Sequence, residues 1–139
     1  ETIAAACARV GRDPAGVDLV ADSKRVDTER LIAAVAAGLT TLGENRVQEA
    51  EAKVGSVGGA TWHLVGPLQS NKARRAVELL QRKEVDGLIL TPVLDVDADL
   101  SHLFELKRRN FPFVLLEDVR GIRANLVDVD NVRASAEAR

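Results

Sequence analysis

The chain has few aromatic and sulfur-containing side chains. Its 139 residues include no methionine, no tyrosine, three phenylalanines, one tryptophan and one cysteine. The single cysteine, Cys7, excludes an internal disulfide, and its alanine-rich surroundings favour a small buried side chain over a reactive thiol. Because the first residue is Glu1 and not methionine, we expect a trimmed, partly ordered or artificial chain.

The sequence also lacks an excess of positive charge and any long apolar run. Nineteen Lys and Arg residues face twenty-one Asp and Glu residues, for a net charge of −2, so the basic surface of a nucleic-acid-binding protein is missing. No apolar stretch approaches the roughly 20 residues of a membrane span, and no signal peptide is present. We therefore expect a cytoplasmic protein that binds neither nucleic acid nor membrane.

Amphipathic helical patterns alternate with short apolar runs along the chain, which is typical of an α/β domain. The content of 46% apolar and 29% charged residues suits one globular domain spanning residues 1–139. The predicted strands are 18–23, 40–43, 61–65, 88–90, 111–116 and 124–129. The predicted helices are 1–11, from Asp27 or Thr28 to Gly38, 46–54, 70–82, from Asp97 or Asp99 to Arg109, and 132–139.

This alternation predicts an open, doubly wound, mainly parallel sheet of five to six strands, flavodoxin-like or Rossmann-like, with helices on both faces. The run LILTP is apolar nearly throughout, as a strand covered on both faces requires. A complete (β/α)₈ barrel needs around 250 residues, so the chain is too short to close one alone. A ligand site is expected at the carboxyl ends of the strands, where the chain carries Lys24, Glu44, Asn45, Gly66, Thr91, Glu117 and Asp118.

Three blocks in the first half share the order and spacing of one known family. The blocks VDLVADSK, LGENRVQEAEAK and WHLVGPLQSNKAR lie within residues 17–79. Together, residues 1–76 resemble the pyridoxal-phosphate homeostasis protein family, which has a barrel of alanine-racemase type. The resemblance implies that Lys24 forms an imine with pyridoxal phosphate, that Asn45 and His63 line the pocket, and that residues 69–72 belong to the family's LQSNK signature.

The sequence around Lys24 and His63 also allows structural roles for these two side chains. An imine-forming lysine needs a depressed pKa, whereas Asp22, two residues before Lys24, would favour the ammonium form. Lys24 can therefore be a solvated lysine at a strand end, and His63 can be a packed, hydrogen-bonded histidine. Segments that would cradle the phosphate and contact the pyridine nitrogen have no counterpart in residues 90–139.

The second half of the chain, residues 77–139, has sequence patterns that differ from those of the first half. The segments VDGLILTP, FPFVLLED and VDVDNV, within residues 77–139, resemble the N-terminal lobe of the lactose-repressor and periplasmic sugar-binding family. The resemblance implies that Asp130 and Asn131 lie near a sugar site between two lobes, although a helix cap explains them more simply. The alternating acidic residues Asp95, Asp97 and Asp99 lack the glycine and glutamate of a calcium loop, so no metal site is expected.

Two partial resemblances that meet within residues 70–92 favour an engineered chimera. We expect a de novo protein that joins a TIM-barrel fragment to a periplasmic-binding-protein-like fragment. Such a protein would not be an enzyme, would hold no cofactor and would have no native activity. The alternative is residual pyridoxal-phosphate binding by imine formation at Lys24, with Asn45 and His63 beside it. Exposed sheet edges favour a homodimer.

Overall fold

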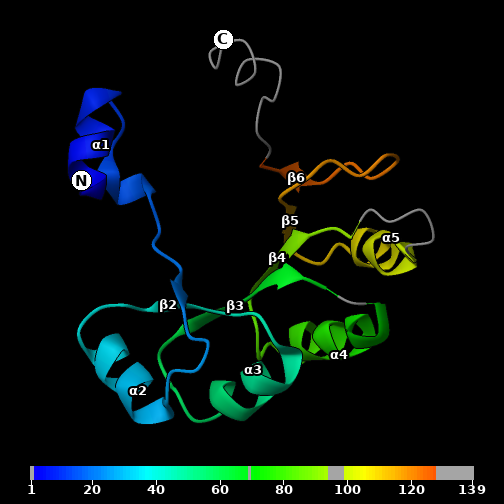
Figure 1. The fold of residues 1–139 in the computed structure, drawn as a ribbon, viewed down its shortest axis with the longest axis horizontal. Coiled ribbons are helices and arrows are strands. Elements are labelled where there is room, and N and C mark those ends of the chain that lie inside the picture. The colour runs from blue at the N-terminus through cyan, green and yellow to red at the C-terminus, as the bar shows by residue number, and fades with distance from the viewer. Residues whose placement is uncertain (1, 69, 94–98, 128–139) are drawn as a thin grey trace.

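A parallel β-sheet with helices along one side forms the centre of the structure, a computed structural model that describes residues 2–68, 70–93 and 99–127 (Figure 1). The strands are β1 (Ala21–Asp22), β2 (Thr41–Glu44), β3 (Thr61–Pro67), β4 (Gly87–Thr91), β5 (Phe113–Leu115) and β6 (Asn125–Leu126). The helices are α1 (Ile3–Arg9), the 3₁₀ turn η1 (Pro14–Gly16), α2 (Thr28–Ala36), α3 (Val47–Val54), α4 (Ser70–Gln81) and α5 (Ser101–Arg108).

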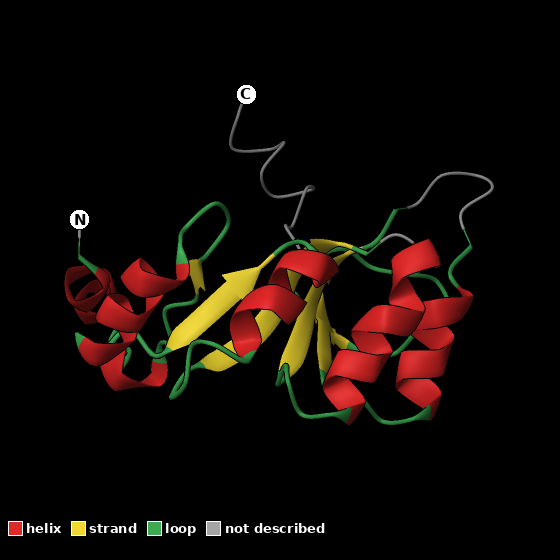
Figure 2. Cartoon of the chain, turned by 90° about the horizontal axis from the view of Figure 1, so that it is seen from below, coloured by secondary structure: helices red, strands yellow, loops and turns green. Residues whose placement is uncertain are grey.

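The six strands lie side by side in the order in which they occur along the chain, and every neighbouring pair is parallel. Crossovers between parallel strands are right-handed, so a sequential order places successive helices on the same face. Figures 1 and 2 show α2, α3, α4 and α5 on one side of the sheet. The α/β class and the parallel six-stranded sheet are confirmed. The prediction placed helices on both faces of the sheet, whereas the sequential strand order puts the connecting helices α2–α5 on one face.

The hydrophobic core lies between the sheet and these helices. Alternate residues of the central strands point toward the helices and are buried, as Leu88 and Leu90 of β4 illustrate. The helices supply the opposing apolar side chains at three- and four-residue spacing, which is the apolar stripe of an amphipathic helix. The buried cluster includes Leu31, Leu42, Ala50, Trp62, Leu64, Ala76, Leu79, Leu88, Leu90, Leu103, Leu106, Phe113 and Leu115.

The opposite face of the sheet is only partly covered. Val65, Ile89 and Val114 occupy the alternate positions of β3, β4 and β5, and each is half-buried. Gly43 of β2 lies between the Val20 and Val65 side chains on this face. The prediction that LILTP is covered on both faces was therefore wrong for Ile89, because the described helices leave its side chain half-buried.

Local capping explains where α2 begins and ends. The Asp27 carboxylate accepts a hydrogen bond of 2.9 Å from the Arg30 backbone N–H, which satisfies one donor of the first helical turn. Asp27, rather than Thr28, is thus the N-cap residue. Gly38 follows the helix with φ of +98°, a conformation that glycine adopts without strain. The same two signals predicted these boundaries from the sequence.

Some predictions concern residues outside the described ranges. These are the terminal helix at 132–139, the cap at Asp130 and Asn131, and the acidic positions Asp95 and Asp97. In the described part of the chain, no helix is both long and apolar enough to cross a bilayer. The single domain over residues 1–139, and association through the edge strands β1 and β6, stay predictions.

Candidate functional site

The carboxyl ends of β1, β2 and β3 bring two of the predicted site residues to one rim of the sheet. Asp22 of β1 is in register with Gly43 of β2, and Lys24 and Asn45 each follow two residues later. The two side chains therefore leave the sheet at the same level. Both residues are exposed, so a ligand can reach them.

Lys24 and Asn45 line one cavity of about 650 Å³ at this rim. The volume falls within the roughly 300–1,000 Å³ of small-molecule sites. The other walls come from the loop after β3 and from the starts of α3 and α4. The complete lining is Lys24, Asn45, Arg46, Val47, Gln48, Glu49, Pro67, Leu68 and Lys72.

A tight turn holds Lys24 at the mouth of this cavity. The Lys24 backbone N–H donates to Asp22 Oδ1 at 2.9 Å, and the Val26 N–H donates to the Ser23 carbonyl oxygen at 3.0 Å. Arg25 has a φ of 59°, a left-handed conformation that reverses the chain. The Asp22 carboxylate, which departs from the resembled family's pattern, is thus used to fix the Lys24 backbone.

The cavity carries more positive than negative side chains. Lys24, Arg46 and Lys72 contribute three cations, and Glu49 contributes one carboxylate. Glu49 already contacts Arg46 Nη1 at 3.5 Å and Lys53 Nζ at 3.6 Å. The amino end of α3 lies in the same wall, and the helix dipole adds partial positive charge there. The arrangement suits a small ligand that carries negative charge.

His63 lies outside this cavity. It sits on β3 in register with Gly43 and Gly87, two residues closer to the amino end of its strand than Val65. A Cβ atom built on Gly87 would lie 3.4 Å from His63 Cδ2, so the ring packs against β4. Its Nδ1 atom is buried without a hydrogen-bond partner among the described residues. The structure therefore brings Lys24 and Asn45 together at the rim, whereas His63 lies on the same sheet closer to the amino ends of the strands.

A buried polar cluster lies beside the cavity. The sequence placed Glu44 at a strand end, but it did not predict that Glu44 is buried together with Ser23 and Lys53. Glu44 and Ser23 are both fully buried. Glu44 Oε2 accepts a hydrogen bond from Lys53 Nζ at 2.6 Å and lies 2.9 Å from Ser23 Oγ. Leu42 and Glu44 alternate along β2, so a period of two would have placed Glu44 on the covered face.

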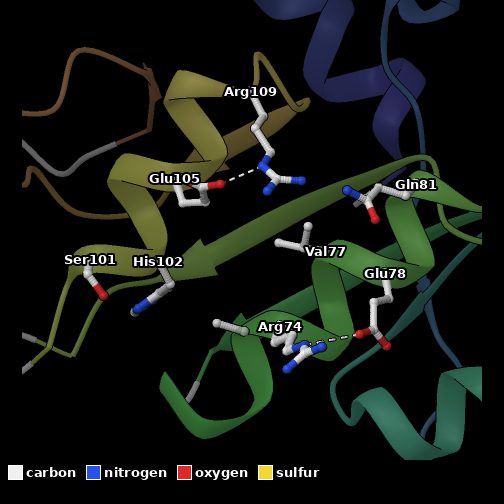
Figure 3. Close-up of a pocket in the computed structure, with 9 residues that line it drawn as sticks. Arg74, Val77, Glu78, Gln81, Ser101, His102, Glu105 and Arg109 are labelled. Carbon is white, nitrogen blue, oxygen red and sulfur yellow. Dashed lines mark hydrogen bonds and ion pairs between the residues drawn. The ribbon is translucent and has the colours of Figure 1, made fainter.

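A second cavity, of about 580 Å³, lies on the far side of the helices between α4 and α5 (Figure 3). Its charged side chains already have partners: Arg74 Nε is 3.3 Å from Glu78 Oε1, and Arg109 Nε is 2.5 Å from Glu105 Oε1. Burial lowers the pKa of His102, which also lines it, below the ordinary value of 6.5. The rim cavity is the better candidate, because neither Lys24 nor Lys72 forms an ion pair with another described residue.

Three curated relatives share sequence with part of this chain. "Pyridoxal phosphate homeostasis protein" of Escherichia coli is 41% identical over 83 residues, which cover 56% of this chain and 36% of that protein. The protein of the same name from Pseudomonas aeruginosa is 42% identical over 90 residues, or 58% and 39% of the two chains. The one from Synechocystis is 38% identical over 95 residues, or 66% and 44%. The chain thus spans less than half the length of these relatives.

Two solved structures of PipY from Synechococcus elongatus resemble the whole described fold. The structure without PLP has a TM-score of 0.57 and 28% identity, and covers 99% of this chain and 62% of its own. The structure with PLP bound has a TM-score of 0.56 and 33% identity, and covers 99% and 63%. No protein-family model matches the chain.

These comparisons overturn the engineered chimera. A single protein, PipY, covers 99% of the chain, including the part at 77–139 that was assigned to a sugar-binding lobe. The second half looked foreign because βα units of many folds share the same apolar strands and polar helix faces. The hypothesis of a de novo protein without native activity was wrong, and the comparisons give no support to the sugar-binding half. In sequence over part of its length and in fold over nearly all of it, the chain is similar to the pyridoxal phosphate homeostasis proteins.

Proposed function

We propose that this chain is a pyridoxal-phosphate-binding member of the pyridoxal phosphate homeostasis proteins, with Lys24 as the residue that binds the cofactor covalently. One observation carries the proposal: Lys24 stands at the carboxyl end of β1 and lines an open cavity together with Asn45. The likeness to PipY, which has been solved with PLP bound, supports pyridoxal phosphate as the ligand.

The residues around the cavity fit such a ligand. Pyridoxal phosphate joins an aldehyde to a dianionic phosphate, and it therefore needs an accessible amine and nearby positive charge. Lys24 provides the exposed amine, and Arg46 and Lys72 provide the charge. When bound, the cofactor supplies an electrophilic carbon that condenses with the lysine amine and releases one water.

Asn45 and Lys72 have binding roles in this proposal. The Asn45 side chain offers both a donor and an acceptor to polar groups of the ligand. Lys72, on the first turn of α4, is half-buried, so part of its hydration is already lost before a ligand arrives. Both side chains orient the bound molecule around Lys24.

The proposed role is binding and not catalysis. General acid–base chemistry is carried out by histidine, carboxylate, lysine, cysteine or tyrosine side chains. In this proposal, Lys24 and Lys72 of the cavity bind the ligand. The lining of the cavity includes no histidine, cysteine or tyrosine, and its carboxylate, Glu49, is already in contact with two cations. We propose a carrier or sensor of the cofactor in the cytoplasm.

Absorbance spectroscopy tests the assignment of Lys24. Adding pyridoxal phosphate to the protein should produce a saturable imine band, and Lys24→Ala should abolish it. Lys107→Ala provides a control, because Lys107 is exposed on α5 and does not line the cavity. Reduction with borohydride followed by peptide mapping should place the label on Lys24. A band that survives in Lys24→Ala would show reaction of unrelated surface lysines and would refute the proposal.

A further inference from the structure

The polar cluster beneath the cavity joins three elements through groups that are shielded from water. Glu44 ends β2, Ser23 follows β1, and Lys53 lies in the last turn of α3. The Lys53 side chain is 12% exposed and that of Glu44 is 0% exposed. Lys53 Nζ donates to Glu44 Oε2 at 2.6 Å and to the Ser23 carbonyl oxygen at 2.8 Å. One ammonium group therefore holds the ends of two strands.

The remaining atoms of the cluster are also satisfied. Ser23 Oγ lies 2.9 Å from Glu44 Oε2 and 2.9 Å from the Gly43 carbonyl oxygen; its single hydrogen can be donated to either. Glu44 Oε1 accepts the Asn45 backbone N–H at 3.0 Å. Every oxygen of the buried carboxylate has a donor, as a buried charge requires.

The cluster is adjacent in the chain to both residues of the proposed site. Ser23 precedes Lys24, and Glu44 precedes Asn45. A restraint on the Ser23 carbonyl and on the Glu44 side chain therefore fixes the direction in which the next two side chains leave the sheet. An apolar contact could hold α3 to the sheet equally well, but it would lack the direction that hydrogen bonds impose.

We propose that Glu44 and Lys53 are positioning residues, which act through Ser23 to hold Lys24 and Asn45 in the geometry that binds the ligand. The inference rests on the proposed function, because it concerns the same cavity. Neither Glu44 nor Lys53 lines that cavity, so their effect on a ligand is exerted through the backbone of the two neighbouring residues.

The double variant Glu44→Met/Lys53→Met separates positioning from stability. Replacing a buried ion pair by apolar side chains of similar size is often neutral for stability, so the double variant should unfold near the parent temperature. Its affinity for pyridoxal phosphate, measured from the imine band, should fall roughly tenfold or more, because small displacements of a reacting group are costly. Parent-like affinity would overturn the proposal.

Asp86→Ala is the matched control. The Asp86 carboxylate accepts the Trp62 backbone N–H at 2.8 Å, and this contact lies at the amino ends of the strands, on the opposite edge of the sheet from Lys24. The variant should lower the unfolding temperature and leave the affinity for pyridoxal phosphate unchanged. If this control also bound pyridoxal phosphate more weakly, the loss of affinity in the double variant would reflect lost stability in general. That result would contradict the proposal.

Amide hydrogen exchange supplies a readout that does not depend on the ligand. The acceptors of the Lys24 and Val26 N–H groups, Asp22 Oδ1 and the Ser23 carbonyl, are unchanged in the double variant. Both amides should nevertheless exchange faster there, whereas the Leu88 N–H, bonded to the Pro112 carbonyl at 3.1 Å, should not. If the parent shows no imine band, the proposed function fails and this exchange pattern still decides the positioning role.

Discussion

The two faces of the sheet are built from the same strands but differ in packing. On the face that α2–α5 cover, alternate residues such as Leu42, Leu88 and Leu115 are almost completely buried. On the other face, Val65 and Ile89 are half-buried. Hydrophobic stabilisation follows the apolar area removed from water, so the covered face carries most of the stability. The open face contributes less to stability, and the exposed rim holds the cavity to which ligand binding is proposed.

The largest expected effect comes from breaking the buried ion pair on the covered face. Lys53→Met removes the partner of a fully buried carboxylate, Glu44, and should cost about 3–5 kcal/mol of unfolding free energy. Urea titration followed by circular dichroism measures this loss. Arg74→Met provides a control, because the Arg74–Glu78 pair is exposed and such pairs contribute about 0–1 kcal/mol. Equal losses in the two variants would contradict the burial argument.

Two adjacent residues of β4 compare the faces directly. Leu88 is 1% exposed and points toward the helices, so Leu88→Ala should cost about 2–5 kcal/mol. Ile89 points to the open face and is half-buried; Ile89→Ala should cost about 1 kcal/mol, in proportion to the smaller area. Denaturant midpoints give both values. A larger loss for Ile89 would show that something covers the open face in solution.

Gly43 tests how tightly the open face is packed near the rim. A Cβ atom at this position would lie 3.1 Å from both Val20 Cγ1 and Val65 Cγ2, so Gly43→Ala should cost about 1–3 kcal/mol. In Gly55→Ala the new Cβ meets no atom within 4 Å, and Gly55 has helical φ and ψ. That variant should gain roughly 0.4–1 kcal/mol. Thermal unfolding of the pair measures the contrast.

His102 gives a smaller, pH-dependent effect on the outer side of the covered face. Burial is the main cause that lowers its pKa below 6.5, while the neighbouring Asp99 opposes the shift. The unfolded chain therefore takes up the proton first as the pH falls. Stability is fully present above pH 6.5 and decreases between 6.5 and the lower pKa of the folded state. In His102→Gln, the unfolding temperature should depend less on pH over this range. An unchanged slope of unfolding temperature against pH would contradict the assignment of this effect to His102.

The smallest effect on stability is expected at the rim itself. Lys24 is exposed, so Lys24→Ala should change the unfolding free energy by no more than about 0.5 kcal/mol. The same substitution should abolish the imine band. A thermal unfolding experiment in the absence of ligand checks the first statement. A large loss of stability would show that the Lys24 side chain contributes to the fold.

The sequence predicted the elements better than their arrangement. The strand at β4 and the capped start of α2 were found because apolar runs and an aspartate cap are local signals. Strand order depends on contacts between distant residues, so the common face of the helices was not found. Lys24 and Asn45 were identified through the resemblance. Glu44 was placed among the candidates at the strand ends, but its burial was not predicted. Glu44 and Leu42 lie on the same face of β2, but a charged side chain is not expected in a hydrophobic core.

The sequential strand order has a consequence for how the chain acquires its structure during synthesis. Each strand from β2 to β6 pairs with the strand that was made immediately before it, so no pairing has to wait for a segment made much later. Pairing between strands that are neighbours in the chain gives a parallel sheet shorter sequence separations than other strand orders would, although parallel pairing is slower than local pairing. A nascent chain can therefore add one βα unit at a time as it leaves the ribosome, and the rim that holds Lys24 needs only β1 and β2 to form.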